Sequence, residues 1–247
     1  MNIIAIIQAR QTSTRLPGKT MRMLSGKPLL QYVVDNLEKA QNINKLVVAT
    51  TTDPEDDIID LWCKRNSIFV YRGDREDVLS RFYECALKYK ADAIVRVTSD
   101  CPLVDPFIVD NVIDLFKNTK SDYSANNLVK SFPHGLDIEI FSFDVLRESF
   151  ENAKKQQERE HVTQYIRARP EKYKLTNFSC SGNYNDIRVT IDEEMDFKLV
   201  ESIIRKLGDD ITFKDLQSLY QENPDLFSIN IDAKSRHREY YKKENII

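Results

Sequence analysis

Strand-like and helix-like segments alternate four times along the first half of the chain, and this alternation is the strongest constraint on its fold. Short runs rich in Ile, Val and Ala predict strands that are buried on both faces. The predicted strands are residues 2–7, 45–51, 67–72 and 91–98, and the predicted helices are 28–41, 54–66, 76–90 and 105–118. The pattern predicts an α/β fold whose mostly parallel sheet has helices on both faces.

The second half of the sequence is less regular. It predicts strands over residues 136–143, 173–180 and 186–192, helices over 144–156, 158–169, 195–207 and 212–222, and a charged tail over 233–247. No Gly/Ser-rich linker or internal repeat divides the chain. We therefore expect one domain over residues 1–247 with an excursion around residues 125–180.

Composition excludes several classes of partner. The net charge of −3 argues against general nucleic-acid binding, which usually needs a basic face. No run approaches the roughly 18 apolar residues of a membrane helix, and the first apolar run is too short for a signal-peptide core. The cysteines are widely spaced and suit reduced thiols: Cys63, Cys85, Cys101 and Cys180. We expect a soluble cytoplasmic protein without a membrane partner.

A basic loop, RQTSTRLPGK, follows the first predicted strand. It holds Arg10, Arg15 and Lys19 within ten residues, and Gly18 lets its backbone approach a ligand closely. Ligands on parallel sheets gather at the carboxyl ends of the strands, and arginine and lysine suit phosphate oxygens. The loop matches neither the Walker motif nor G-x-G-x-x-G. A solvated loop whose arginines pair with helix acids is the alternative, but the loop's position favours an anion site, most simply for a nucleoside triphosphate.

The same segment carries a resemblance to a known family. IIQARQTSTRLPGK resembles the signature of the sugar-acid cytidylyltransferases, in which an A-R dipeptide precedes S-x-R-L-P-G-K. Within them the chain most resembles the spore coat polysaccharide biosynthesis protein F family. The shared motifs occur in the family's order: RGDREDVLSRFYECA (72–86), RVTSDCPLVDP (96–106), HGLDIEIFS (134–142), EREHVTQYI (158–166) and RVTIDEEMDF (188–197).

The resemblance implies a Rossmann-like sheet of the glycosyltransferase-A type. It also implies transfer of CMP from CTP to an anionic sugar, with Mg²⁺ as cofactor and a homodimer as the assembly. Membership of this group suggests a precursor of a cell-surface polysaccharide. The acceptor or dimer contacts would lie in the excursion around residues 125–180.

Two acids are candidate metal ligands. Asp100 and Asp192 each follow a predicted strand and match metal-binding acids of the resembled family. Mg²⁺ prefers one or two carboxylates together with substrate phosphates and water. The alternative is that each acid caps the next helix, which is a common role of Asp. Asp105 and Asp196 are expected to be caps.

The resemblance also assigns nucleotide-binding residues. Lys19 would stabilise the transition state with Arg10, Asp100 and Asp192 as the other catalytic residues, and Ala9 would contact the base or ribose. The full predicted nucleotide set is Ala9, Arg10, Ser13, Arg15, Lys19, Asp77, Arg81 and Ser99. An ion pair within one helix is the alternative for Asp77 and Arg81, which are four residues apart.

The acceptor would be bound by the second half of the chain. Asp137 and Glu139 share one face of a predicted strand and suit a metal, sugar hydroxyls or an amino group. Arg159 and His161 would bind an acceptor carboxylate or phosphate. His134 is a candidate acceptor ligand because it lies in the shared HGLDIEIFS motif. His237 in the tail lies in no such motif. A general base is needed only if the nucleophile is a hydroxyl.

Two other functions compete with a cytidylyltransferase. A glycosyltransferase with a nucleotide-sugar donor could use the same sheet, but such enzymes usually carry an acid-x-acid pair, and TSDCP offers one acid. A nucleotide-binding protein without catalysis is the second alternative. The presence of Lys19, Asp100 and Asp192 argues against it.

Overall fold

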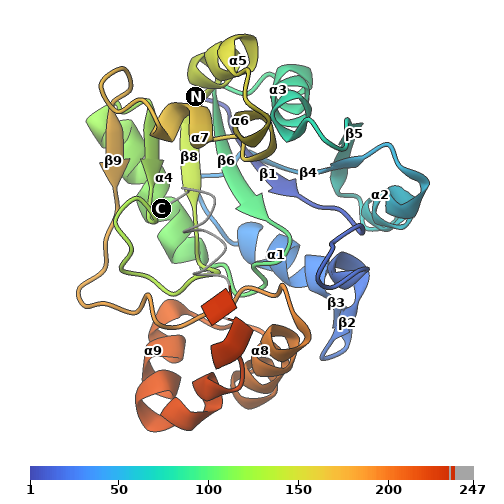
Figure 1. Ribbon diagram of the computed structural model, residues 1–247, viewed down its shortest axis with the longest axis vertical. Coiled ribbons are helices and arrows are strands. Elements are labelled where there is room, and N and C mark those ends of the chain that lie inside the picture. The colour runs from blue at the N-terminus through green and yellow to red at the C-terminus, as the bar shows by residue number, and fades with distance from the viewer. Residues whose placement is uncertain (234, 237–247) are drawn as a thin grey trace.

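The computed structural model describes residues 1–233 and 235–236 and contains a central sheet of seven strands in this part of the chain (Figure 1). The strand order is β5-β4-β1-β6-β8-β7-β9. Strand β8 runs antiparallel to β6 and β7, and the other neighbours are parallel. The strands are β1 Ile3–Gln8, β4 Lys45–Thr51, β5 Phe69–Gly73, β6 Ala93–Thr98, β7 Tyr123–Ala125, β8 Glu139–Ser142 and β9 Leu175–Asn177. The predicted mostly parallel α/β fold is confirmed.

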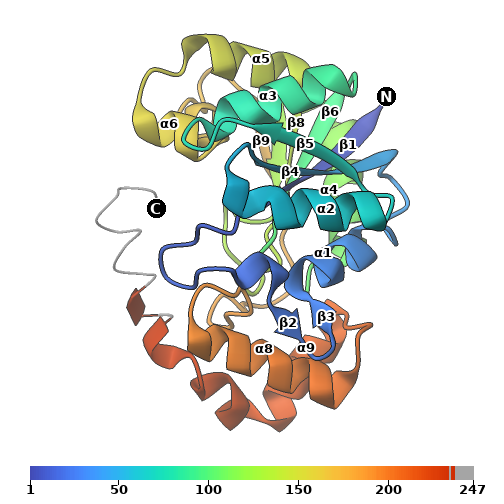
Figure 2. The ribbon, with the colours of Figure 1, turned by 90° about the vertical axis from the view of Figure 1, so that its right-hand side faces the viewer.

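Helices cover both faces of this sheet (Figure 2). Alternate residues of β1 feed two separate cores, because successive side chains of a strand point to opposite faces. Ile3 and Ile7 pack with α1, α2, α4, α8 and α9, whereas Ile4 and Ile6 pack with α3, α5 and α7. The helices are α1 Leu29–Leu37, α2 Asp57–Arg65, α3 Val78–Lys88, α4 Pro106–Thr119, α5 Phe143–Asn152, α6 Gln156–Glu160, α7 Gln164–Arg167, α8 Glu194–Leu207 and α9 Phe213–Glu222.

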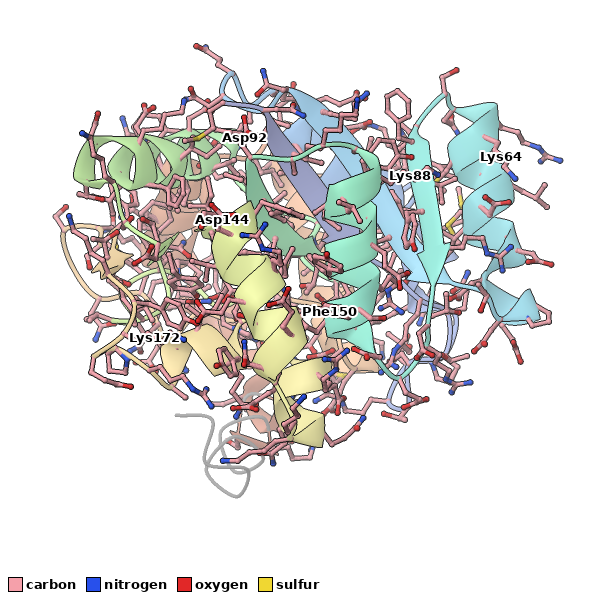
Figure 3. The ribbon with its side chains drawn as sticks, turned by 90° about the horizontal axis from the view of Figure 1, so that it is seen from above. Lys64, Lys88, Asp92, Asp144, Phe150 and Lys172 are labelled. Carbon is pink, nitrogen blue, oxygen red and sulfur yellow. The ribbon has the colours of Figure 1, made fainter. Side chains whose placement is uncertain are left out.

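Helices α3 and α5 lie side by side above the sheet (Figure 3). The ring of Tyr83 on α3 stacks on Phe150 of α5, with centroids 4.3 Å apart. Phe143 stacks on the same tyrosine at 5.8 Å. Aromatic pairs at these distances add to the free energy gained by burial alone. The excursion after residue 125 is thereby fastened to the first half of the chain.

Smaller elements complete the described structure. Strands β2 Met23–Leu24 and β3 Lys27–Pro28 form a short antiparallel hairpin. Three 3-10 helices cover Lys19–Met21, Pro54–Asp56 and Pro224–Ser228. No helix among residues 1–233 and 235–236 is long and apolar enough to cross a membrane. Most of the predicted tail, including His237, lies outside the described residues.

Three predictions for the second half differ from the structure. Residues 186–192 are not a strand; they make one isolated bridge, between Arg188 and His134. The helix predicted over 158–169 is divided into α6 and α7, because Val162 adopts a positive φ of 45°. The short strand β7 was not predicted. It is held by pairing with β8 and β9, which a local pattern does not encode.

Candidate active site

The loop that follows β1 folds back on itself at the carboxyl edge of the sheet. Gly18 has a positive φ of 75°, and its amide donates to the carbonyl of Gln11 at 2.9 Å. The hydroxyl of Thr20 donates to the carbonyl of Arg10 at 2.9 Å and lies 3.4 Å from that of Ser99. These bonds bring the end of the loop beside the end of β6. The predicted residues Ala9 and Ser99 are buried in this corner.

Lys19 stands at the centre of the site. Its ammonium donates to Asp100 Oδ2 at 2.9 Å, to Asp192 Oδ1 at 2.8 Å and to the carbonyl of Ile191 at 2.7 Å. Lys19 is only 7% exposed. The basic loop and the two distant aspartates therefore converge, as the sequence predicted.

Three cations surround Asp192. Besides Lys19, the guanidinium of Arg15 lies 3.0 Å from Asp192 Oδ2, and Arg188 donates to the same oxygen at 2.9 Å. Arg188 also donates twice to Asp196, each time at 2.9 Å. The centre thus balances three cationic against three anionic groups: Lys19, Arg15 and Arg188 against Asp100, Asp192 and Asp196.

The pKa values reflect this balance. Burial alone would lower the pKa of Lys19, but the carboxylates of Asp100 and Asp192 outweigh it and raise that pKa above its ordinary value. Burial would raise the pKa of Asp192, yet Lys19 and Arg15 hold it well below its ordinary value. The ammonium and the Asp192 carboxylate are therefore both charged at neutral pH.

Of the four aspartates that could cap a helix, two do so and two do not. Asp196 accepts from the amides of Asp192 and Glu193, both at 3.0 Å, and so caps α8 as expected. Asp105 caps α4 by accepting from the amide of Phe107 at 2.7 Å. The carboxylates of Asp100 and Asp192 cap neither helix and turn to Lys19 instead.

A cavity of about 740 Å³ opens beside this centre, on the side of β6, β8 and α7. It has both basic and acidic walls, which suits a polar ligand that carries charge. Its lining includes Arg15, Asp100, Asp192, Arg96, Lys130, His134, Asp137, Glu139, His161, Gln164 and Arg167.

His134 and Asp137 form a pair on one wall of the cavity. The imidazole Nδ1 lies 3.0 Å from Asp137 Oδ2, which also accepts from the amide of Gly135 at 3.0 Å. Burial would raise the pKa of Asp137, but His134 and the Gly135 amide lower it to about 2. Asp137 is therefore ionised at neutral pH.

Glu139 is buried and fully engaged. One carboxylate oxygen accepts from the hydroxyls of Tyr123 at 2.6 Å and Thr163 at 2.8 Å, and the other pairs with Arg96. Burial alone would raise the pKa of Glu139, but the guanidinium groups of Arg96 and Arg167 hold it below its ordinary value. The carboxylate thus orients the wall of the cavity.

The predicted residues Arg159 and Asp77 lie together, away from the cavity lining. Arg159 pairs with Asp77 and donates to the carbonyl of Phe150 at 2.8 Å. Asp77 also caps α3 by accepting from the amide of Ser80 at 2.9 Å. Arg159 and Asp77 therefore link α6 to α3, and the predicted association of Arg159 with His161 at an acceptor is not what the geometry shows.

Arg81 does not pair with Asp77 either. It is fully buried, and its Nη1 donates to the carbonyl of Asp74 at 2.7 Å. Nε and Nη2 of this guanidinium have no hydrogen-bond partner in the described structure. Burial and the nearby charge of Arg10 lower the pKa of Arg81 to about 10. Arg10 and Arg81 thus form a basic patch between the loop after β1 and helix α3. Within the loop, the predicted residue Ser13 accepts from the amide of Leu16 at 3.4 Å.

Three arginines of the site were missed by the sequence reasoning. Arg96 interrupts the apolar strand AIVRVT, and such a charge in a buried strand was a usable signal. Arg167 lies six residues after His161 and three after Gln164, so that their spacing along a helical segment could have indicated a shared face. Arg188 had no such signal, because its partners Asp192 and Asp196 needed the fold to be recognised.

Comparison with known proteins decides the family. The family model for cytidylyltransferases matches residues 4–237. The chain belongs to the cytidylyltransferase family. The spore coat polysaccharide biosynthesis protein SpsF of Bacillus subtilis is 34% identical over 233 residues, which are 91% of this chain and 96% of that protein. An uncharacterized protein of Methanocaldococcus jannaschii is 33% identical over 96% of this chain and 97% of its own.

Solved structures of cytidylyltransferases share the fold of this family member. A cytidylyltransferase from Leptospira borgpetersenii aligns with a TM-score of 0.88 and 32% identity, over 92% of this chain and 97% of that one. A CMP:2-keto-3-deoxy-manno-octonic acid synthetase complexed with CTP aligns at 0.64 with 16% identity, over 83% and 99%, and supports the fold alone. The expected family, nucleotidyltransferase fold and enzyme class are confirmed.

Proposed function

We propose that this cytidylyltransferase uses Mg²⁺ and transfers CMP from CTP to an anionic sugar or sugar-acid precursor of a cell-surface polysaccharide. The observation that carries the proposal is the convergence of Lys19, Asp100 and Asp192 beside a large cavity with charged walls. The likeness to SpsF over most of both chains supports the polysaccharide part. A 3-deoxy-manno-octulosonate cytidylyltransferase of Geobacter sulfurreducens, 36% identical over 46% of this chain and 44% of its own, supports a sugar acid as acceptor.

The acids of the site fit a magnesium ion. Asp100 and Asp192 each direct one oxygen to the same nitrogen, so both face one point. Mg²⁺ commonly takes one or two carboxylates and fills its remaining positions with phosphate oxygens and water. Bound there, the ion would neutralise charge on the phosphate oxygens.

The reaction that we propose is an in-line displacement at phosphorus. An acceptor oxygen forms a bond to the α-phosphorus of CTP while the bond to the bridging α–β oxygen breaks. The products are the CMP-sugar and pyrophosphate, and a hydroxyl nucleophile would also release its proton. In this reaction Lys19 and Arg15 would bind the phosphate oxygens on which charge grows, which is how such sites stabilise a transition state.

The two sides of this centre would divide the substrates. Arg10 and Arg81 lie on the side of β1 and α3, and we assign the nucleotide there. The cavity on the side of β8 and α7 would take the acceptor. On its wall, the Arg167 guanidinium acts on Glu139 through its charge but makes no side-chain hydrogen bond or close ion pair within residues 1–233 and 235–236, so its N–H groups can bind an acceptor carboxylate.

An enzyme assay tests the proposal. The protein is incubated with CTP, MgCl₂ and a panel of sugar acids, neutral sugars and sugar phosphates, and pyrophosphate is measured. We expect pyrophosphate only with CTP and an anionic acceptor, and its loss when EDTA is added. Release of a nucleoside diphosphate from a nucleotide-sugar would favour a glycosyltransferase. Binding of CTP without turnover on any acceptor would favour a non-catalytic protein.

The homodimer and the cytoplasmic location expected from the sequence remain predictions. Light scattering of the purified protein tests the assembly, and a mass equal to one chain of 28.8 kDa would contradict the dimer.

A further inference from the structure

The ammonium of Lys19 is saturated in this structure. A protonated lysine has three N–H groups, and Lys19 uses them on Asp100, Asp192 and the carbonyl of Ile191. No donor is left for a phosphate. Lys19 can therefore bind a nucleotide only if it gives up at least one of these partners.

The oxygen of each carboxylate that does not face Lys19 already has a partner. Asp100 Oδ1 accepts from the hydroxyl of Thr98. Asp192 Oδ2 is held by Arg15 and Arg188. The oxygens that face one common point are those bound to Lys19, so a cation held there by both acids would take the place of the ammonium.

Charge gives the direction of this exchange. The centre is balanced without a ligand, with three cationic and three anionic groups. A bare divalent ion would add two positive charges within reach of Lys19 and Arg15, which opposes its binding. A triphosphate that arrives with the ion supplies negative charge to both side chains and frees the two acids.

We propose that Lys19 holds the place of the divalent cation until CTP binds, and then moves from Asp100 and Asp192 to the phosphates. This inference rests on the proposed function and adds an order to it: metal and nucleotide bind together, and neither acid binds a metal well alone. Lys19 is then a positioning residue for the metal site as well as a phosphate ligand. Thermodynamic coupling is reciprocal, so the metal also strengthens the binding of CTP.

Direct binding of Mn²⁺, followed by the electron paramagnetic resonance of the free ion, tests this order without turnover. The nucleotide-free wild type is compared with Lys19→Met and with Lys27→Met. The control removes a lysine that pairs with Asp35 and Asp209 instead. We expect Lys19→Met to bind one Mn²⁺ on the order of tenfold more tightly than the wild type, and Lys27→Met to match the wild type. The double variant Lys19→Met/Asp100→Asn should lose this gain.

Equal Mn²⁺ affinity of the wild type and Lys19→Met overturns the inference. If Lys19→Met does not fold, Lys19→Gln replaces it, and the wild type alone gives a second measurement. The ¹⁵Nζ resonance of Lys19 should be unchanged by Mg²⁺ and shifted by Mg²⁺ with CTP; a shift with Mg²⁺ alone overturns the proposal. Failure of the wild type to bind CTP under any condition would instead remove the proposed function.

Discussion

Asp100 and Asp192 share one lysine, but their surroundings differ. Asp192 has Lys19, Arg15 and Arg188 around it, and its side chain is 12% exposed. Asp100 has Lys19 as its cationic partner and is 23% exposed. Removal of the Asp192 charge leaves three cations with one carboxylate fewer, which is costly in a buried site. Asp100 is therefore the better position at which to separate catalysis from stability.

We expect Asp100→Asn to lower kcat by on the order of 10²-fold or more, because an amide is a poorer ligand than a carboxylate for the proposed Mg²⁺ and leaves developing charge uncompensated. The variant should remain folded, since the amide oxygen can still accept from Lys19 and the amide nitrogen can donate to the hydroxyl oxygen of Thr98. Turnover of CTP is measured at saturating Mg²⁺, with circular dichroism as the check on folding. Asp35→Asn, which loses a pair with Lys27 outside the site, is the control. Full activity of Asp100→Asn would remove this residue from the proposed metal site.

Arg167→Gln addresses the acceptor alone. The substitution removes a guanidinium charge from the cavity wall, so we expect the KM for an acidic acceptor to rise by about tenfold or more. The KM for CTP should stay within about twofold, because Arg167 lies on the other side of the centre. Steady-state kinetics with each substrate varied in turn measure both values. Arg169→Gln, which loses a pair with Glu158, is the matched control. A rise in the KM for CTP alone would contradict this division of the cavity.

For individual residues, the sequence predicted the centre of the site better than the residues around it. Lys19, Asp100 and Asp192 each follow a strand end or occupy the loop after one, and topology brings such positions to one edge. Arg159 was assigned to the acceptor on its motif, but its guanidinium pairs with Asp77 on another helix. The carboxylate with which a cationic side chain pairs depends on contacts between distant segments. No local sequence pattern encodes these contacts.

Among the elements, the extended segment 187–192 brings Arg188, Thr190 and Asp192 to the site. Its residues Ile187, Val189 and Ile191 are buried with the core, and this alternation is why the segment was predicted as a strand. Its backbone bonds go to loops: Val189 donates to His134 and Ile191 to Asp100, both at 2.8 Å. The alternation of buried side chains was predicted correctly, but the backbone of the segment does not form the continuous hydrogen-bond ladder of a strand. The segment thus connects the His134 turn to the loop of Asp100.

Gly135 is where this connection is tightest. A Cβ atom there would lie 2.5 Å from the amide nitrogen of Thr190, and its φ of 110° is unfavourable for other residues. We expect Gly135→Ala to lower the free energy of unfolding by on the order of 3 kcal/mol, because the backbone strain and the backbone clash add. Turnover should also fall, because the clash displaces the segment that carries Asp192. Denaturant unfolding and kcat are measured together.

Gly208→Ala separates strain from the clash. Gly208 also has a positive φ, of 84°, but a Cβ there meets no atom within 4 Å. This variant should lose only about 1 kcal/mol and keep its activity, since strain acts without displacement of the site. Equal losses in the two variants would show that the contact with Thr190 is without consequence.

For the whole molecule, acid should weaken the fold through the carboxylates that are held ionised. The pKa of Asp137 is about 2 in the folded protein and 3.8 in its ordinary state. A lowered pKa contributes stability that is present above pH 3.8 and is lost as the pH falls through about 2. We expect the free energy of unfolding of the wild type to fall more steeply between these pH values than that of Asp137→Asn. Asp144→Asn, at an exposed pair with Arg147, should keep the steeper slope.

The antiparallel direction of β8 has a consequence for how the protein could change its substrate. In the register of this strand Glu139 lies opposite Arg96, so the beginning of β8 meets the end of β6. Residues 126–138 connect β7 to β8 along the rim of the cavity, so a change at the positions of this span that face the cavity leaves the ladder pairs behind them in place. A different acceptor could therefore be accommodated by substitutions at Asn127, Lys130 or His134, while the buried residues of the span and the basic loop after β1 stay unchanged.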